Sequence, residues 1–192
     1  MNPLVNRLVY LEDALDATAG AYPFPKDSQA LRELAWIFEP YRRFRISGEI
    51  EKKDPDSFLS VITDVEHRIM RHITGHGLEI LLDTRFERLG GGAGWSMIRE
   101  TGAQGRTGAF SEGIRAYVSV RERPDGRYTY TIGRMSPFIR FNIVSMLARL
   151  NEAEGTTDTK DRWGGGNTIG GSPRVAGSKL TPEEVQTIIN EF

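Results

Sequence analysis

The sequence contains no cysteine, which excludes disulfide bonds, iron–sulfur clusters and zinc sites built from thiolates. It also lacks any apolar run approaching the roughly 20 residues that a membrane-spanning helix needs. Its first residues are soon followed by acidic side chains and do not show the basic and then apolar pattern of a secretory signal. Hydrophobic residues make up 39% of the chain and charged residues 27%, which is ordinary for a globular protein. These features predict a cytoplasmic protein without membrane contacts.

A set of ligands for a catalytic metal is lacking too. Asp13 and Asp16 fall on a segment with helical spacing, where carboxylates usually face the solvent. His72 and His76 are four residues apart and could form a metal pair on a helix, but His76 lies between two glycines, where the helix should have ended. We expect both histidines, and His67, to be solvated near a helix end, where they favour the helix dipole. The chain itself is therefore predicted to hold no metal and no catalytic residue.

The charges are distributed unevenly along the chain. The whole sequence of 192 residues has a net charge of −1, but residues 1–98 carry −3 and residues 99–179 carry +5. Eleven arginines lie between Arg99 and Arg174. The guanidinium fork matches two phosphate oxygens at once, so this segment could bind a phosphate compound. A solvated, arginine-rich surface explains the same composition, and charge alone does not separate the two interpretations.

The first 75 residues are predicted to be helical, because their apolar side chains recur every three or four positions. The pattern predicts helices at residues 4–15, 28–40 and 54–73. The segment Tyr22–Pro25 separates the first two, since its two prolines cannot lie inside a helix. Ser28 and Asp54 are the expected N-caps, and Pro40 marks the expected end of the second helix.

Short strands are predicted in the next part of the chain. They are expected at residues 78–83, 86–89, 95–99, 116–121 and 127–132. The last two form the clearest hairpin, since they are rich in β-branched and aromatic residues and are joined by the turn sequence Pro124–Gly126. The cluster Gly90–Gly94 predicts a hairpin turn or bulge, because it lacks the glycine spacing of a dinucleotide-binding fingerprint.

Two further helices complete the expected fold. Helical spacing returns at residues 138–150, and a final helix begins with a capping box in which Thr181 precedes Glu184 by three positions. Helices followed by strands with helices between them predict an α+β fold. We expect a helical segment over residues 1–75 and a mixed β-sheet domain with packed helices over residues 76–192.

A polar, glycine-rich loop is predicted over residues 155–177. Its three consecutive glycines permit close approach by a phosphate and can direct backbone amides toward it. Neighbouring polar side chains add neutral donors and one charged fork. The groups concerned are Gly164, Gly165, Gly166, Asn167, Thr168, Ser172 and Arg174. The alternative is a flexible linker, although linkers rarely place tryptophan and isoleucine so close to their glycines.

This loop resembles the GGGH-x-x-A-x-G signature of the DHH-associated domain, the C-terminal domain of DHH-superfamily phosphoesterases such as oligoribonuclease-like and exopolyphosphatase-like proteins. Residues 164–166 match the triple glycine, and Gly170–Gly171 lie in the closing part of the signature. Asn167 stands where the family has a phosphate-binding histidine, which keeps a hydrogen-bond donor but removes a titratable group. The family also has a Ser-Arg-Ser-like turn between a strand and a helix, and Arg134 and Ser136 occupy the corresponding turn here.

The resemblance covers residues 115–192 well and the preceding residues loosely. It implies that the domain holds a phosphate-containing substrate, such as a nucleotide, a polyphosphate or a short nucleic acid. The Mn²⁺ or Mg²⁺ ions of the family belong to a separate DHH domain that is missing here, so we expect the C-terminal part of a longer phosphoesterase, inactive alone. The alternative is a non-catalytic protein-interaction or dimerisation domain whose glycine loop only turns the chain.

Overall fold

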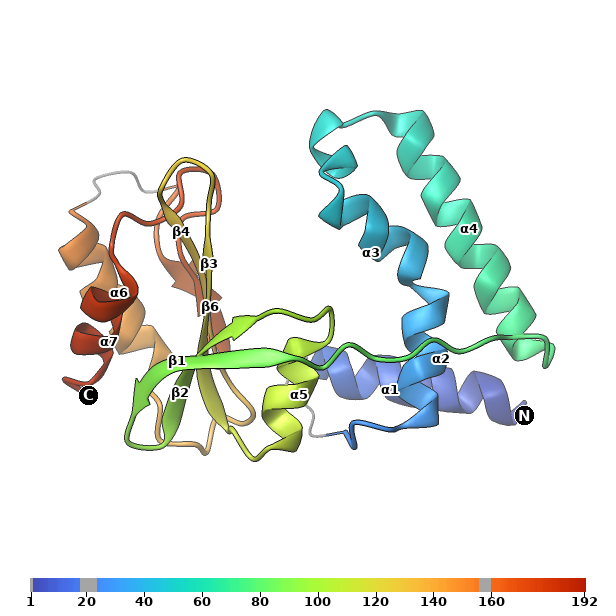
Figure 1. Cartoon of the computed structure of the whole chain (residues 1–192), viewed down its shortest axis with the longest axis horizontal. Coiled ribbons are helices and arrows are strands. Elements are labelled where there is room, and N and C mark those ends of the chain that lie inside the picture. Colours follow the sequence, from blue (N-terminus) through green and yellow to red (C-terminus); the bar gives the residue numbers. More distant parts are fainter. Residues whose placement is uncertain (1, 18–23, 156–159) are drawn as a thin grey trace. The chain divides into compact units, whose positions relative to one another are not determined.

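The computed structural model describes residues 2–17, 24–155 and 160–192, and its fold class is α+β, as the sequence predicts (Figure 1). The chain forms two compact units, the first mainly helical and the second built on a β-sheet. The helical unit comprises Met1–Ala14 and Pro25–Leu82, and the sheet unit comprises Leu15–Phe24 and Asp83–Phe192. None of the helices in the described ranges combines the length and the apolar character that a membrane span requires.

The helices that precede the sheet are α1 (Pro3–Ala17), α2 (Gln29–Ile37), α3 (Glu39–Ile46), the 3-10 helix η1 (Glu49–Lys52) and α4 (Pro55–Ile73). Ser28 and Asp54 cap α2 and α4 with their side-chain oxygens, as predicted. The second helix ends at Ile37, close to the predicted end near Pro40, and a new helix that the sequence analysis did not predict begins at Glu39. Pro40 lies in the first turn of α3, where a missing N–H costs no hydrogen bond. Part of the predicted break at Tyr22–Pro25 lies outside the described residues.

The helical unit is held together by an apolar cluster and by polar contacts at its surface. Trp36 and Ile37 of α2 are buried with Val65 of α4. The guanidinium groups of Arg68 and Arg71 lie 5.1 and 5.4 Å from the centre of the Trp36 ring, within the range of a cation–π interaction.

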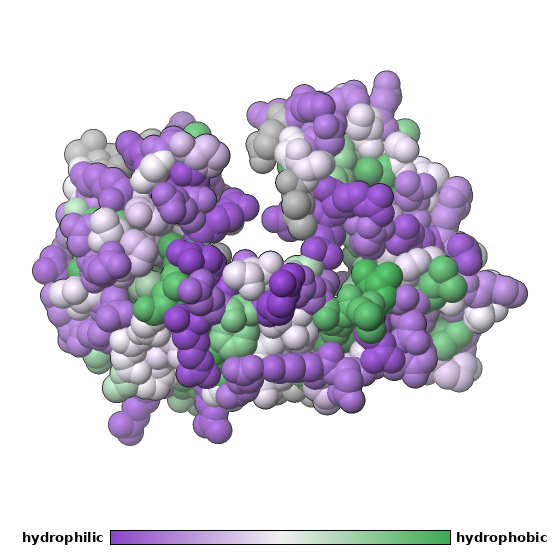
Figure 2. All heavy atoms as spheres, in the orientation of Figure 1, coloured by the Kyte–Doolittle hydropathy of each residue, from purple (hydrophilic) through white to green (hydrophobic). Residues whose placement is uncertain are grey.

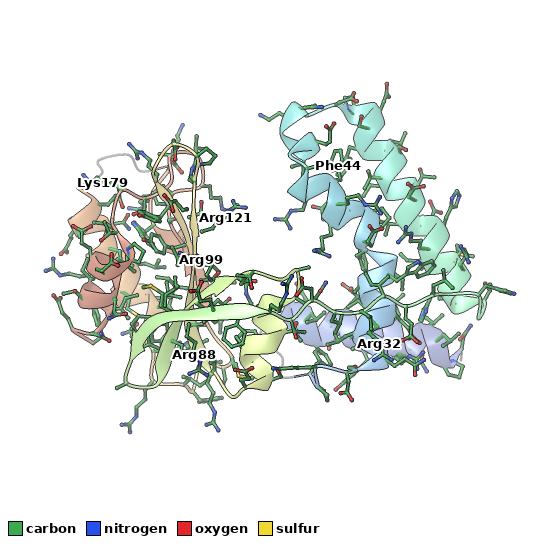
Figure 3. All side chains as sticks on the ribbon, viewed as in Figure 1. Arg32, Phe44, Arg88, Arg99, Arg121 and Lys179 are labelled. Atoms are coloured by element: carbon green, nitrogen blue, oxygen red, sulfur yellow. The ribbon has the colours of Figure 1, made fainter. Side chains whose placement is uncertain are left out.

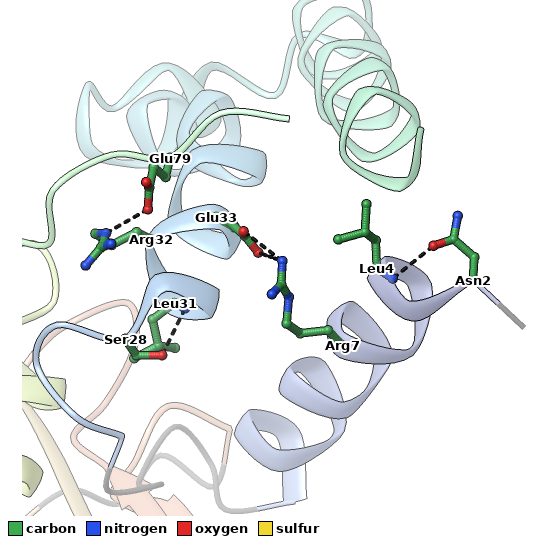
Figure 4. A network of polar contacts seen from close by, with 8 residues as sticks. All are labelled: Asn2, Leu4, Arg7, Ser28, Leu31, Arg32, Glu33 and Glu79. Atoms are coloured by element: carbon green, nitrogen blue, oxygen red, sulfur yellow. Dashed lines mark hydrogen bonds and ion pairs between the residues drawn. The ribbon is translucent and has the colours of Figure 1, made fainter. Parts of the chain in front are cut away.

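The polar contacts of this unit join α1, α2 and the segment that follows α4 (Figure 4). Arg7 pairs with Glu33 at 2.6 Å, and Arg32 pairs with Glu79 at 2.8 Å. Both pairs are partly open to solvent, and ion pairs at a protein surface typically contribute about 0–1 kcal/mol each, so the apolar cluster is the larger source of stability.

The expectation of solvated histidines is wrong for His72. This side chain is only 4% exposed, whereas His67 and His76 are exposed. The chain folds back after α4 and brings Gly77 against the imidazole, where a Cβ would lie 3.0 Å from the His72 Cα atom. The burial of His72 therefore follows from a close backbone approach that helical spacing does not show.

The sheet unit contains a six-stranded mixed sheet in the order β1-β2-β3-β4-β6-β5, within the described residues. Its strands are β1 (Phe86–Gly92), β2 (Trp95–Glu100), β3 (Ala116–Glu122), β4 (Tyr128–Arg134), β5 (Gly164–Gly165) and β6 (Ile169–Gly171). Neighbouring strands are antiparallel except for β2 and β3, which are parallel. The unit also contains the helices α5 (Gly105–Ser111), α6 (Ile143–Glu154) and α7 (Pro182–Ile189).

Three expectations for the chain after α4 need correction. Residues 78–83 form no strand: the Ile80 amide donates to the Arg32 carbonyl at 3.3 Å, and no neighbouring strand pairs with the segment. Helix α6 begins at Ile143 rather than at residue 138, because Asn142 caps it. The predicted glycine loop contains the strands β5 and β6. The capping box at Thr181, the turn at Gly90–Gly94 and the β3–β4 hairpin are confirmed.

The two faces of the sheet carry different cores. One face packs against α6 and α7 through a large apolar cluster that includes Val118, Ile132 and Leu150. The other face packs against α5, where Tyr117 meets Phe110 with ring centres 5.4 Å apart. Figure 1 shows α6 and α7 on one side of the sheet and α5 on the other.

A small polar cluster lies under α5. Arg106 donates to Glu100 at 2.8 Å, and its guanidinium lies 5.0 Å from the centre of the Tyr117 ring. Burial raises the pKa of Tyr117 above its ordinary value. These contacts fasten α5 to the sheet.

Candidate functional site

Most of the residues that the sequence singles out meet at one end of the sheet. Strand β4 ends at Arg134 and strand β6 begins at Ile169, and the register pairs Gly133 with Ile169. The turn that holds Ser136 therefore lies beside the tip of the β5–β6 hairpin. We call this tip, residues 166–168, the hairpin tip.

The hairpin tip is fastened to β4 by backbone hydrogen bonds. The Arg134 amide donates to the Thr168 carbonyl at 2.9 Å, and the Gly166 amide donates to the Ile169 carbonyl at 2.8 Å. One amide of the triple glycine is therefore used inside the turn and does not point toward a ligand. Because Gly166 and Asn167 are exposed, the surface of the tip is still open to solvent.

A buried tryptophan anchors the strand that leads into the tip. Trp163 is 1% exposed and stacks on Tyr130 with ring centres 5.4 Å apart. Its indole N–H donates to Glu154 at 3.1 Å, and its backbone N–H and carbonyl both bond to Asn151. Glu154 is itself buried and also accepts from the Ser178 hydroxyl at 2.6 Å. This part of the glycine-rich segment is therefore a fixed hairpin and not a flexible linker.

Arg134 is the central cation of this end of the sheet. Its Nε donates to the Asn167 carbonyl at 2.6 Å and its Nη1 donates to the Ile139 carbonyl at 2.8 Å. An arginine has five N–H donors, so several remain available. In the described part of the chain Arg134 forms no ion pair with a carboxylate. The result is a guanidinium whose orientation is fixed by two carbonyls and whose charge is not neutralised nearby.

The three glycines before the tip differ in what surrounds them. A Cβ at Gly165 would lie 2.3 Å from the Gly170 Cα atom, and the φ of Gly165 is +154°, so the paired strand requires glycine here. A Cβ at Gly166 would meet nothing within 4 Å, and one at Gly164 would only approach the Arg162 carbonyl at 3.8 Å. Neither of these two glycines has a positive φ. The fold therefore requires glycine at one of the three positions.

The neighbouring turn adds a hydroxyl and an exposed aromatic ring. The Ser136 Oγ accepts from the Phe138 amide at 3.3 Å, and Ser136 follows Arg134 by two residues in the chain. Phe138 is 94% exposed. Both residues follow β4 directly, and the second guanidinium bond of Arg134, to Ile139, closes this turn against the hairpin tip.

Arg174 follows the opposite end of β6, and no contact in the described residues joins it to Arg134. The amides after it are held by Asp161, which accepts from Val175 at 3.0 Å and from Ala176 at 2.7 Å. These bonds, the one from Ala176 first, keep the pKa of Asp161 below its ordinary value. The Asp161 carboxylate therefore already accepts the amides that follow Arg174. The part of Arg174 in phosphate binding stays a prediction.

Sequence reasoning missed Arg115 as a member of this end of the sheet. The Met135 amide donates to the Arg115 carbonyl at 2.9 Å, and Ala116 pairs with Arg134. The signal was present in the predicted β3–β4 hairpin, because a tight hairpin places the residue before its first strand beside the residue after its second.

The described residues contain no group of three or more histidine, aspartate or glutamate side chains that could hold a metal ion. Comparison of the chain with protein-family models, with curated proteins and with solved structures finds no match.

Proposed function

We propose that the sheet unit binds a phosphate group of a nucleotide, a polyphosphate or a short nucleic acid at Arg134 and the hairpin tip. In this proposal the chain is the substrate-binding part of a DHH-type phosphoesterase. Hydrolysis in the complete enzyme would depend on Mn²⁺ or Mg²⁺ held by a separate domain, and this chain would bind without cleaving.

The observation that supports phosphate binding most strongly is the environment of Arg134. Two carbonyl oxygens fix its guanidinium, and no carboxylate of the described residues neutralises it. An oriented cation without a counter-ion favours an incoming anion, and a guanidinium can meet two phosphate oxygens together. Its partial burial reduces screening by salt compared with a fully exposed side chain.

The open space at Gly166 supports the same proposal. A Cβ there would touch nothing in the protein, so the glycine leaves the backbone uncovered beside Asn167 and Arg134. Uncovered backbone allows a phosphate to come close to the chain. Asn167, exposed at the tip, offers a neutral donor where the resembled family has a histidine.

A second candidate function is favoured by Phe138. A phenyl ring that is 94% exposed is a typical contact residue of a protein interface, so the same end of the sheet could bind a protein partner. The two functions differ in their response to salt, because phosphate binding depends on charge and burial of a phenyl ring does not.

The test is the affinity of the chain for pyrophosphate and for a short single-stranded oligonucleotide at low and high salt. We expect weak binding that weakens as salt rises. Arg134→Ala should lower the affinity about 10- to 150-fold, since a hydrogen bond to a charged group is worth about 1.5–3 kcal/mol. Gly166→Val should also lower it, because the new side chain covers the tip.

Arg121→Ala is the matched control, because Arg121 is an exposed arginine near the opposite end of β3 (Figure 3). It removes the same charge and should change the affinity little. Binding that ignores salt, or Arg134→Ala and Gly166→Val variants that bind as the unmodified chain does, would refute phosphate binding at this place and favour the protein-interaction function.

A further inference from the structure

A concave surface lies at the same end of the sheet as the hairpin tip. It is a hollow of about 430 Å³, within the size range of small-ligand sites. The β1–β2 turn forms one wall, and the chain between α5 and β3 forms the other. The residues that matter for its chemistry are Arg88, Gly94, Ser96, Glu112, Gly113 and Arg115. We call this hollow the arginine hollow.

The arginine hollow has an excess of positive charge. Arg88 and Arg115 contribute two guanidinium groups, and Glu112 contributes one carboxylate. Neither arginine forms an ion pair within the described ranges of the chain. The carboxyl end of α5 could attract a cation, but the Gly113 amide already bonds the Phe110 carbonyl at 2.9 Å. The carboxylate of Glu112 and the carboxyl end of α5 together therefore balance at most one of the two guanidinium charges, and the hollow keeps an excess of positive charge.

The wall of the hollow has room for a ligand that approaches the backbone. Gly94 and Gly113 both have positive φ, and a Cβ at either position would meet nothing within 4 Å. Ser96 is half-buried and adds a hydroxyl-bearing residue to the lining of the hollow. Hydrophilic side chains project from the lower margin of the sheet unit in Figure 2, the margin where the β1–β2 turn lies in Figure 1.

The hollow and the hairpin tip lie along the same end of the sheet. Arg115 lines the hollow, and only its backbone reaches toward the tip, where its carbonyl accepts the Met135 amide directly after Arg134. The strands in order from the hollow to the tip are β2, β3, β4 and β6. With neighbouring strands about 4.8 Å apart, these three intervals span roughly 14 Å. A single phosphate cannot cover that distance, but a chain of phosphates can.

We propose that the arginine hollow is a second anion site, which binds a further phosphate of the ligand held at the hairpin tip. This proposal rests on the proposed function and adds a requirement on the ligand: it must carry several phosphates in a row, as inorganic polyphosphate and a nucleic-acid backbone do. The chain then selects its ligand by length, and pyrophosphate is too short to reach both sites.

The test compares pyrophosphate with a longer inorganic polyphosphate and with a single-stranded oligonucleotide of equal charge. The unmodified chain should bind both longer ligands more tightly than pyrophosphate. The double variant Arg88→Ala/Arg115→Ala should lower the affinity for the longer ligands at least about tenfold, since two charged contacts are lost, and should leave pyrophosphate binding unchanged. If only one of the longer ligands shows this loss, that ligand's chemistry is the one that the hollow recognises.

The control is the double variant Arg121→Ala/Arg127→Ala, which removes two exposed arginines near the other end of β3 and β4. It should affect both ligand lengths equally and slightly. The proposal is overturned if pyrophosphate and the longer ligands bind equally, or if the Arg88/Arg115 variant behaves as this control does. If that variant lowers all affinities while Arg134→Ala lowers none, the proposed function fails at the hairpin tip as well. Loss with Arg134→Ala but not with Arg88→Ala/Arg115→Ala leaves the proposed function standing and removes only the second site.

Discussion

Two glycine-rich hairpins lie at the same end of the sheet, and their glycines serve different purposes. In the β1–β2 hairpin a Cβ at Gly90 or Gly92 would meet Gln186 or Asn190 of the α7 segment. Between them, the Gly91 amide donates to the Gln186 side chain at 2.9 Å, and the Gly91 carbonyl accepts from Asn190 at 3.4 Å. In the β5–β6 hairpin Gly165 faces the paired strand, whereas Gly166 faces open space. Only the β5–β6 hairpin has a glycine, Gly166, that neither a positive φ nor a close neighbouring atom requires within the described residues.

The comparison shows why a run of glycines is not in itself a binding site. A missing side chain can make room for a helix, for a paired strand or for something outside the protein. These cases differ in which atoms an added Cβ would touch. The structure gives these neighbours, and the sequence alone does not. The variants below test the comparison in order of expected effect.

The largest effect is expected from Gly165→Val compared with Gly166→Val. Valine at position 165 would collide with Gly170 and would be strained at a φ of +154°. We expect a loss of about 1–3 kcal/mol in the free energy of unfolding, as for other overpacked sites. Gly166→Val should stay within about 0.5 kcal/mol of the unmodified chain, since its side chain points into solvent. Urea denaturation of both variants measures the difference.

This pair also separates folding from binding. Gly165→Val should lower the affinity for the ligand because the hairpin itself is disrupted. Gly166→Val should lower the affinity while the variant stays folded. Equal stability losses in the two variants would show that the tip is packed against something, and the distinction between the two hairpins would disappear.

A smaller effect is expected from Gln186→Ala in α7. The Gly91 amide would lose its acceptor, and a hydrogen bond of this kind contributes about 0.5–1.5 kcal/mol. The affinity for pyrophosphate should not change, because Gln186 contacts Gly90 and Gly91 of the β1–β2 hairpin and not the hairpin tip. Calorimetric unfolding and a pyrophosphate titration on the same sample check both points, and a clear loss of affinity with unchanged stability would contradict them.

The fold was largely predictable from the sequence wherever apolar residues recur at a regular spacing or a capping or turn residue marks the end of an element. The caps at Ser28, Asp54 and Thr181 and the β3–β4 hairpin carry their own local hydrogen-bonding groups, so short windows reveal them. Helix α5 was missed because Gly105 and Gly108 weaken its helical pattern, and both are needed for close approach to the chain around Thr84 and Arg85.

The candidate site was predictable only in part, for a similar reason. The sequence shows Arg134 as part of a turn after a predicted strand, and it shows the triple glycine as a motif. The bond from Arg134 to Asn167 joins two segments that are 33 residues apart in the chain, and it depends on the pairing of β4 with β6. Strand β6 has only three residues, two of them glycine, so its pairing leaves no periodic pattern to predict it.

The smallest effect concerns the base of the β5–β6 hairpin, where Asp161 accepts the amides of Val175 and Ala176. These bonds hold the pKa of the folded state below the ordinary value of 3.8. The stabilisation is therefore complete above pH 3.8 and is lost as the pH falls through the lower pKa of the folded chain. Because the carboxylate is open to solvent, the contribution is expected to be small. The difference in unfolding free energy between the unmodified chain and Asp161→Asn should be constant near neutral pH and should narrow in acid. A difference that stays the same between neutral pH and about pH 3 would mean that the charge of Asp161 does not hold the base of this hairpin.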